Sequence, residues 1–470
     1  MKKVLLVNTN TERNPYPVPP LGICLLSQSI KHKYNVLIYD GVFEEHTKLI
    51  SAIEQFKPDY IGLSIRNIDD MVIEKTTCYT NSILENFVEP IKKISIAKII
   101  LGGSGFSIFP FELFRLYNAD YGVVGESEEI FLQLLDSLDQ NLSTEKILGV
   151  ISKSTQEEAF RKSNKAGDIN NLSYSEIDKQ IDFNPYKSRG VYSIQTKRGC
   201  YHKCIYCTYP LIEGTKYQTR NPESIASEIE QAYHRLGYFT FEFVDSTFND
   251  PPGHAEAVCK AIIRKNISIK LRTMGVNPKH SSPELFELML KAGFAQIDCT
   301  PDSASPTMIE NLKKGFTLKD LQNTARLIKE FNLPTMWFFL SGGPGENENT
   351  LKETFDFIDN YISSQDMVHL TNGLRIYPGT YLEQIAVNEG IITKGTNLLS
   401  PAFYISKELT IEKLDKIIKE AAKTRHNCIP AFESKPSALM LQQAYKLKEE
   451  LNIDEPMFRT LLRVRKQNFI

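Results

Sequence analysis

Short apolar, β-branched runs alternate with helical patterns through most of this 470-residue chain, and this alternation constrains the fold more than any other feature. The first run, Lys-Val-Leu-Leu-Val at 3–7, has no polar alternation and is typical of a parallel strand buried on both faces. Strands that alternate with helices build a parallel sheet covered by helices on both sides. We therefore expect an α/β protein, long enough for two or three domains.

The first series of strands predicts a Rossmann-like, flavodoxin-like domain over residues 1–145. The loops after such strands meet at one edge of the sheet, where α/β proteins bind ligands. One of these loops, Gly-Gly-Ser-Gly at 102–105, lets a backbone approach a ligand closely, although a glycine-rich turn is also ordinary turn chemistry. The five strands of this sheet are expected at 3–7, 35–39, 60–64, 97–101 and 121–124.

Residues 146–188 are polar and irregular and predict a linker. The second series predicts a partial (β/α)6 barrel over 189–388, whose working residues lie at the carboxyl ends of its strands. In residues 389–470 the alternation of strand-like and helical patterns stops, which predicts a small helical C-terminal region. The six barrel strands are expected at 191–196, 239–245, 267–273, 294–299, 334–340 and 371–377.

Three of the eight cysteines, Cys200, Cys204 and Cys207, are clustered at C-x3-C-x2-C spacing after the first barrel strand. The other five are scattered, which is not the pattern of a secreted disulfide framework and indicates reduced thiols in the cytoplasm. The apolar run at the start is too short for a signal peptide, and no run approaches membrane-spanning length. A net charge of −2 gives no reason to expect nucleic acid or an anionic membrane as the partner.

Soft thiolates crowded into eight residues select zinc, copper(I) or iron–sulfur. Structural zinc usually closes its tetrahedron with four ligands in two pairs, and no second pair of cysteines follows here. His202 lies inside the loop, but its spacing is not that of a zinc finger. The motif therefore favours a [4Fe–4S] cluster held by three cysteines, which leaves one iron open to a small molecule.

The cysteine motif, with Tyr206 before its last cysteine and Arg198-Gly199 before its first, resembles the signature of the radical S-adenosylmethionine (radical SAM) superfamily. The amino-terminal domain is similar to the cobalamin (vitamin B12)-binding domain found in one large branch of that superfamily. The segments that carry the resemblance outside the cysteines are Gly102-Gly-Ser-Gly105, Val123-Val-Gly-Glu-Ser-Glu128, Phe243-Val-Asp245, Gly342-Gly-Pro-Gly-Glu346 and Tyr377-Pro-Gly-Thr380.

The resemblance implies that the open iron binds the amino and carboxylate groups of S-adenosylmethionine. An electron from the reduced cluster would cleave the sulfonium to methionine and a 5′-deoxyadenosyl radical, which abstracts hydrogen from an unactivated carbon. The implied function is a cobalamin-dependent methyltransferase acting on a small-molecule, lipid or peptide substrate, with an electron donor such as flavodoxin or ferredoxin. The alternatives are a rearrangement, cyclisation or carbon–carbon bond formation without methyl transfer, and a non-catalytic iron–sulfur redox protein.

Carried over residue by residue, the resemblance makes Cys200, Cys204 and Cys207 the cluster ligands. Tyr206 would approach the adenine of S-adenosylmethionine, partly through its backbone. Asp245 would contact the methionine end of the cofactor or the substrate, or else simply cap a loop. The other positions expected to contact S-adenosylmethionine are Ser246, Ser303, Gly342 and Gly343.

The cobalamin resemblance has one departure from pattern. Domains that supply a histidine to cobalt carry Asp-x-His-x-x-Gly, which this chain lacks, so His32 and His46 are expected at the surface. Cobalt would then be bound without a protein histidine, or the site is degenerate. The residues expected to cradle cobalamin are Asn8, Thr9, Asn10, Ser64, Arg66, Gly102, Gly103, Ser104, Gly105, Gly125, Glu126 and Ser127.

Overall fold

The computed structural model describes residues 1–162, 167–187, 190–237 and 240–467. Several predictions therefore lie partly outside the described residues. They concern residues 163–166 and 188 of the expected linker, residue 189 at the expected start of the barrel, residue 239 of its second strand, and residues 468–470 of the C-terminal region.

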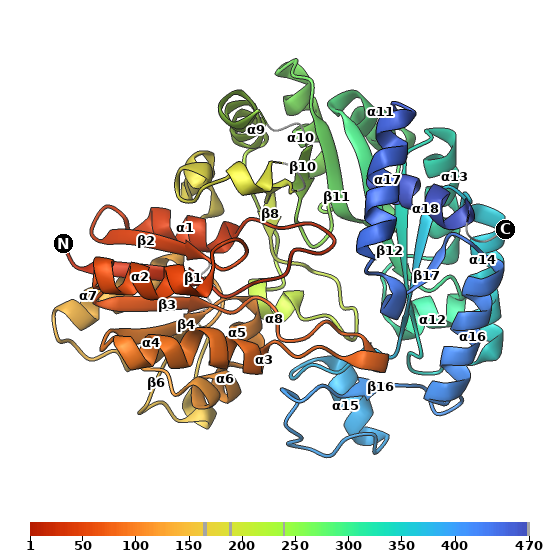
Figure 1. The fold of residues 1–470 in the computed structure, drawn as a ribbon. Coiled ribbons are helices and arrows are strands. Elements are labelled where there is room, and N and C mark those ends of the chain that lie inside the picture. The colour runs from red at the N-terminus through yellow and green to blue at the C-terminus, as the bar shows by residue number, and fades with distance from the viewer. Residues whose placement is uncertain (163–166, 188–189, 238–239, 468–470) are drawn as a thin grey trace.

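The amino-terminal part is a six-stranded sheet with strand order β2-β1-β3-β4-β5-β6 (Figure 1). The five expected strands are confirmed and pair in parallel. Their register places Asn8 opposite both Asp40 and Ser64, and Ser64 opposite Gly102, so the strand ends share one edge. The strands are β1 (Lys3–Asn8), β2 (Asn35–Asp40), β3 (Tyr60–Ser64), β4 (Lys98–Gly102), β5 (Tyr121–Val123) and β6 (Val150–Ser152).

Helices cover this sheet because each presents an apolar stripe to it. The helices are α1 (Leu21–Ile30), α2 (His46–Phe56), α3 (Thr80–Ile83), α4 (Glu89–Ile94), α5 (Ser104–Ile108), α6 (Pro110–Tyr117) and α7 (Glu128–Asp139). A π-helical turn at Leu84–Val88 separates α3 from α4 in the helical segment that follows β3.

The segment expected to be a polar linker is packed more firmly than its composition indicates. Strand β6 lies within it and pairs antiparallel with β5, at the edge of the first sheet. Further along, Tyr174, Ile177, Phe183 and Tyr186 are buried in the same hydrophobic cluster as the barrel. Together with Ile169, which is buried in the same cluster, these side chains fold the segment onto the barrel, because burial of a few large side chains outweighs average composition.

The second sheet has seven parallel strands in the order β17-β14-β13-β12-β11-β10-β7. Its edge strands β7 and β17 are not paired with each other, so the barrel is open, as expected of a partial barrel. The strands are β7 (Tyr192–Ile194), β10 (Thr240–Phe243), β11 (Lys270–Val276), β12 (Phe294–Asp302), β13 (Thr335–Ser341), β14 (Met367–Asn372) and β17 (Cys428–Pro430).

The barrel differs most from the sequence prediction at its last two strands; β11 also begins three residues later than expected, at Lys270. The sixth strand lies at Met367–Asn372 rather than 371–377, because Gly373 adopts a positive φ of 68° and turns the chain away. The residues beyond it form β15 (Leu374–Arg375), which pairs antiparallel with β16 (Phe403–Tyr404). The seventh strand, β17, was not predicted, since three residues ending in proline carry no strand pattern.

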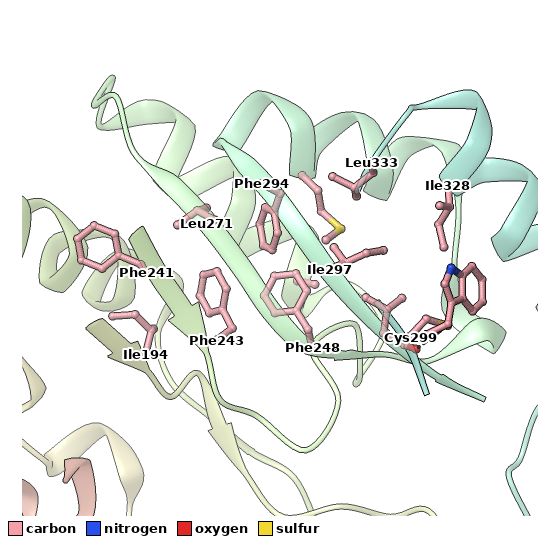
Figure 2. Packing of buried hydrophobic residues seen from close by; sticks show 14 of the residues in the cluster. Ile194, Phe241, Phe243, Phe248, Leu271, Phe294, Ile297, Cys299, Ile328 and Leu333 are labelled. Atoms are coloured by element: carbon pink, nitrogen blue, oxygen red, sulfur yellow. Dashed lines mark hydrogen bonds between the residues drawn. The ribbon is translucent and has the colours of Figure 1, made fainter. Parts of the chain in front are cut away.

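Helices cover the outer face of the barrel and bury its main core (Figures 1 and 2). Phe241 and Phe243 on β10 point into this core beside Phe294. Because side chains alternate along a strand, Glu242 between them lies on the opposite face, inside the barrel. The helices of this part are α8 (Tyr209–Glu213), α9 (Pro222–Leu236), α10 (His254–Arg264), α11 (Pro283–Ala292), α12 (Pro306–Asn311), α13 (Leu318–Glu330), α14 (Glu348–Tyr361) and α15 (Tyr381–Asn388).

The C-terminal region is mainly helical, as expected, and contains α16 (Ile411–Thr424), α17 (Ala438–Glu450) and α18 (Met457–Gln467). Phe458 and Leu462 of α18 pack with Met367, the first residue of β14. Arg459 of the same helix binds Asp366 at 2.8 Å. Helix α18 therefore covers the amino end of the barrel strands, opposite the edge where the cysteine loop lies. Within the described residues, no helix is both long and apolar enough to cross a membrane.

Candidate cofactor sites between the two sheets

The cysteine loop leaves β7 and is closed by a short antiparallel pair, β8 (Lys197–Arg198) with β9 (Gln218–Thr219). Within this closed segment the Cys200 N–H donates to the Gly214 carbonyl at 3.1 Å, and the Cys207 N–H donates to the Cys204 carbonyl at 3.1 Å. Gly199 has a φ of 88°, and a Cβ there would lie 2.1 Å from the Lys216 carbonyl oxygen. Only glycine fits this position, which explains Arg-Gly-Cys in the motif.

Asp245 holds the start of this loop. Its buried carboxylate accepts hydrogen bonds from the Thr196 N–H at 2.8 Å, the Thr196 hydroxyl at 2.7 Å and the Lys197 N–H at 3.2 Å. Ser246 donates its hydroxyl to the Gly199 carbonyl at 3.3 Å. Both residues therefore lie beside the cysteine loop, and Asp245 caps it; their contact with S-adenosylmethionine stays a prediction.

The donor set of the loop fits an iron–sulfur cluster. Among the described residues, no three His, Cys, Asp or Glu side chains converge on a single ion. A [4Fe–4S] cluster does not require such convergence, because each thiolate binds a different iron. Cys200 is buried, and Cys204 and Cys207 are half-buried on the same loop. Burial, followed by the neighbouring Cys204, raises the pKa of the Cys207 thiol to about 12, so a bound cation is needed to hold it as a thiolate.

A buried polar cluster that sequence reasoning missed ties Tyr206 to the barrel. The Tyr206 hydroxyl donates to Asp302, the last residue of β12. The Lys314 ammonium lies 2.6 Å from the same carboxylate and 3.0 Å from the Tyr206 hydroxyl. No local pattern in the sequence marks Asp302, or Lys314 twelve residues later, as a partner of Tyr206. The cluster fixes the last turn of the cysteine loop against the fourth barrel strand.

The remaining positions expected to contact S-adenosylmethionine make hydrogen bonds to other residues of the protein. The buried Ser303 hydroxyl lies 3.0 Å from the Thr354 hydroxyl and accepts the Ser305 N–H at 3.1 Å. The N–H groups of Gly342 and Gly343 both donate to the Glu346 carboxylate, the second at 3.1 Å. Gly342 has a φ of 97°, which this tight loop requires. Cofactor contacts by these three residues stay predictions.

The burial of Glu346 predicts that the stability of the fold depends on pH. Burial raises the pKa of its carboxyl to about 7, although two backbone N–H groups favour the charged form. The unfolded chain ionises this group from about pH 4.3, so folding loses stability as the pH rises from there to about 7. We expect Glu346→Gln to raise the Tm by a margin that grows over this window and then stays constant, measured by thermal unfolding.

The control for that measurement is Glu353→Gln, on the exposed face of α14. It should change the Tm by the same small amount at every pH. A Glu346→Gln margin that does not vary between pH 5 and 8 would contradict the assignment.

A cavity lies at the carboxyl edge of the first sheet and faces the cysteine loop. Arg198 and Glu213 of that loop line it from the opposite side. Thr9, Asn10 and Arg66 line a second, smaller pocket. The expected cobalamin residues that line the main cavity are Ser64, Gly102, Gly103, Ser104, Gly125, Glu126 and Ser127.

Asn8 and Gly105 lie outside both pockets. Asn8 is buried and donates its side-chain amide to Asp40 at 2.8 Å, which fixes the end of β1. Gly105 packs against the loop after β3, since a Cβ there would lie 2.9 Å from the Arg66 carbonyl oxygen. Their structural contribution is to shape the edge of the sheet rather than to line a pocket.

The main cavity fits a cofactor with polar groups. Gly103 has a φ of 98°, and a Cβ there would lie 2.6 Å from the Ile65 carbonyl oxygen, so this position must be glycine. One oxygen of Glu126, Oε1, is enclosed and has no hydrogen-bond partner among the described residues. Burial raises the pKa of Glu126 to about 7, against the charge of Arg198. A ligand with amide or hydroxyl groups could supply the hydrogen bond that Glu126 Oε1 lacks, and Gly103 leaves the backbone open to its approach.

The cavity and the cysteine loop share one ion pair. Both side chains, Arg198 and Glu128, are almost fully buried, and the guanidinium makes two hydrogen bonds to the carboxylate at 2.6 and 3.2 Å. Arg198 also donates to Gln195 at 3.1 Å. Burial opposes ionisation of Glu128, but the charge and hydrogen bonds of Arg198 hold its pKa below the usual range. Because Arg198 stands two residues before Cys200, this pair connects the two sites directly.

The two histidines of the first domain do not enter the cavity. His32 is exposed, as expected. His46 is half-buried at the first residue of α2, and its Nε2 is enclosed without a hydrogen-bond partner among the described residues, so the expected surface position is wrong for this residue. Neither residue lines the main cavity.

Two family models match the chain, a B12 binding domain at residues 9–135 and the Radical SAM superfamily at residues 194–358. The second match begins at the end of β7 and contains the whole cysteine loop. The chain therefore contains a radical SAM domain preceded by a B12-binding domain.

Relatives of this radical SAM protein span most of its length. An uncharacterized methyltransferase of Pyrococcus horikoshii is 24% identical over 89% of this chain and 91% of its own. The tryptophan 2-C-methyltransferase of Streptomyces laurentii is 23% identical over 75% of this chain and 69% of its own.

Solved structures share the fold of the radical SAM protein. TsrM of Kitasatospora setae, a radical S-adenosylmethionine methyltransferase with cobalamin and a [4Fe–4S] cluster bound, matches with a TM-score of 0.81. That match is 20% identical and covers 99% of both chains. OxsB, with aqua-cobalamin and S-adenosylmethionine bound, matches with a TM-score of 0.73 at 15% identity, over 100% of this chain and 71% of that one. The predicted fold class is confirmed.

Proposed function

We propose that this protein is a cobalamin-dependent radical SAM methyltransferase that methylates an unactivated carbon of a small-molecule, lipid or peptide substrate. The observation that carries the proposal is the buried Arg198–Glu128 pair, which joins the cavity of the B12-binding domain to the cysteine loop. Two cofactor sites joined in this way suit a methyl group that passes from one cofactor to the other. The methyltransferases among the relatives support the same reading.

Cys200, Cys204 and Cys207 would hold the cluster, and S-adenosylmethionine would bind its open iron beside Ser246 and Tyr206. When bound, these groups supply one-electron cleavage of a sulfonium, and cobalamin supplies a carrier for the methyl group. The protein's own part is to position them: Asp245 fixes the start of the loop, and Asp302 with Lys314 fixes its end. Flavodoxin or ferredoxin would supply the electron, and we place the protein in the cytoplasm.

The cavity would hold part of the cobalamin. Gly102, Gly103 and Gly125 leave backbone free to approach it, and Glu126 offers a carboxyl that burial keeps partly protonated near neutral pH. Hydroxyls of Ser64, Ser104 and Ser127 line the same cavity and can exchange hydrogen bonds with amide groups of the cofactor.

The interior face of the barrel would receive the substrate. Glu242, Arg272 and Asp298 lie on this face, since the residues that alternate with them are buried under the outer helices. Arg272 binds Glu242 at 2.6 Å, and Tyr16, from the B12-binding domain, donates to the same carboxylate at 2.6 Å. The pairing neutralises two charges, so the interior would suit a substrate of low net charge.

The test is a labelling experiment on protein reconstituted without oxygen. We expect about four irons per chain and one bound cobalamin. With methyl-labelled S-adenosylmethionine and a reductant, the label should reach the cobalamin, as shown by chromatography and mass spectrometry. Formation of 5′-deoxyadenosine without any transfer of label would favour the rearrangement or cyclisation reading. Neither product, with a full cluster, would overturn the enzymatic proposal.

A further inference from the structure

Tyr217 places its hydroxyl against a sulfur of the cysteine motif. The Tyr217 oxygen lies 3.8 Å from the Cys200 Sγ and 3.1 Å from the Thr247 hydroxyl. The backbone fixes this position, because Gln218, the next residue, pairs with Arg198 in the β8–β9 ladder, two residues before Cys200. Thr247 comes from the other side, just after the strand β10 and Asp245.

The direction of these hydrogen bonds follows from the chemistry of the groups. A thiolate that ligates iron carries no proton and can only accept. A phenol has one proton to donate, while its oxygen can accept another. With Cys200 as a ligand, the Thr247 hydroxyl therefore donates its hydrogen bond to the Tyr217 oxygen, and the Tyr217 hydroxyl donates to the sulfur. Thr247 makes no other side-chain hydrogen bond among the described residues, so its proton is free for this use.

We propose that Tyr217 raises the reduction potential of the cluster by donating this hydrogen bond to the Cys200 sulfur. The inference rests on the proposed function for the identity of the cluster. Reduction adds one electron, supplied by the external donor, and the added negative charge is spread over the cluster and its sulfurs. A donor aimed at a ligating sulfur stabilises that charge more in the reduced state than in the oxidised state. The proton stays on the Tyr217 oxygen throughout. Tyr217 is thus a positioning and tuning residue.

Tyr201 provides a matched comparison within the same loop. It follows Cys200 directly, and its ring contacts that of Tyr217 edge-on with centroids 5.2 Å apart. Its hydroxyl, however, donates to Asp250 at 3.3 Å and has no hydrogen bond to a cysteine sulfur among the described contacts. Removal of this hydroxyl deletes the same atom from the same kind of ring without touching the sulfur.

The experiment is a potentiometric titration of the reconstituted full-length protein, with the reduced cluster followed by electron paramagnetic resonance. Tyr217→Phe should shift the midpoint to a more negative potential, so that several-fold less reduced cluster forms at a fixed potential near the wild-type midpoint. Thr247→Val should shift it in the same direction by less, because it only removes the group that polarises the phenol. Tyr201→Phe should leave the midpoint unchanged.

A Tyr217→Phe midpoint equal to that of the wild type, with full iron content, overturns the inference and leaves the proposed function intact. Should Tyr217→Phe assemble no cluster, Thr247→Val decides, and no shift in that variant overturns the inference. A wild-type protein that binds no iron at this loop overturns the proposed function itself, and the inference with it. The iron content of each variant distinguishes these cases.

Discussion

Cys204→Ala is expected to abolish cluster assembly and methyl transfer together. The variant removes one of three thiolates from the loop, and the nearby His202 is already held by Asp250 at 2.8 Å and Asn277 at 2.9 Å. Two thiolates leave a second iron without a protein ligand, and a [4Fe–4S] cluster is then poorly retained. Iron per chain should fall from about four to near background, as should the cluster's visible absorbance and the transfer of labelled methyl.

Cys78→Ala is the matched control for this result. Cys78 is exposed, lies after β3, and belongs to neither the cysteine loop nor the main cavity. Loss of this thiol should leave iron content, spectrum and label transfer as in the wild type. A Cys204→Ala protein that retains the full iron content would refute the ligand assignment.

Glu128→Ala is expected to destabilise the protein strongly. The substitution leaves the Arg198 guanidinium buried without its carboxylate, and removal of one partner of a buried ion pair costs roughly 3–5 kcal/mol. Because Arg198 also lies at the start of the cysteine loop, cluster retention should fall as well. Both effects can be read from the midpoint of denaturant unfolding and the iron content of the purified protein.

Two further variants distinguish the effect of the unpaired buried charge on stability from the effect of shortening a side chain. Glu129→Ala, at the neighbouring exposed position, should change stability by less than about 0.5 kcal/mol. Adding Arg198→Met to Glu128→Ala should recover part of the lost stability. The methionine removes the unpaired charge and fills the space of the arginine stem with an apolar side chain. If Glu128→Ala unfolds no earlier than Glu129→Ala, the ion pair is not a structural connection between the two sites.

The pH dependence of this pair has the opposite sign to that of Glu346. The pKa of Glu128 is held below its usual range, so its contribution is complete above the unfolded pKa of about 4.3 and disappears as the pH falls further. Ionisation of Glu346 lowers the stability of the fold as the pH rises, whereas protonation of Glu128 lowers it as the pH falls. For these two groups together, stability is therefore expected to be maximal where the two ranges meet, at about pH 4.3.

Local patterns determined much of this protein from its sequence alone. Alternation of apolar runs with helical patterns was sufficient for the two series of strands, because strand burial and helix periodicity are written in neighbouring residues. The spacing of Cys200, Cys204 and Cys207 was sufficient to predict an iron–sulfur site, because a single loop carries all three. The errors fell on short elements, such as β17, and on the few large apolar residues within a polar segment.

The tertiary structure decided everything that depends on residues far apart in the chain. Glu128 and Arg198 are 70 positions apart, Tyr206 and Asp302 are 96 apart, and Tyr16 and Glu242 are 226 apart. No local pattern marks such partners, since a buried charge is tolerated only where the fold brings its counter-charge. The same holds for Tyr217, an ordinary tyrosine in the sequence that the β8–β9 ladder carries to the sulfur of Cys200.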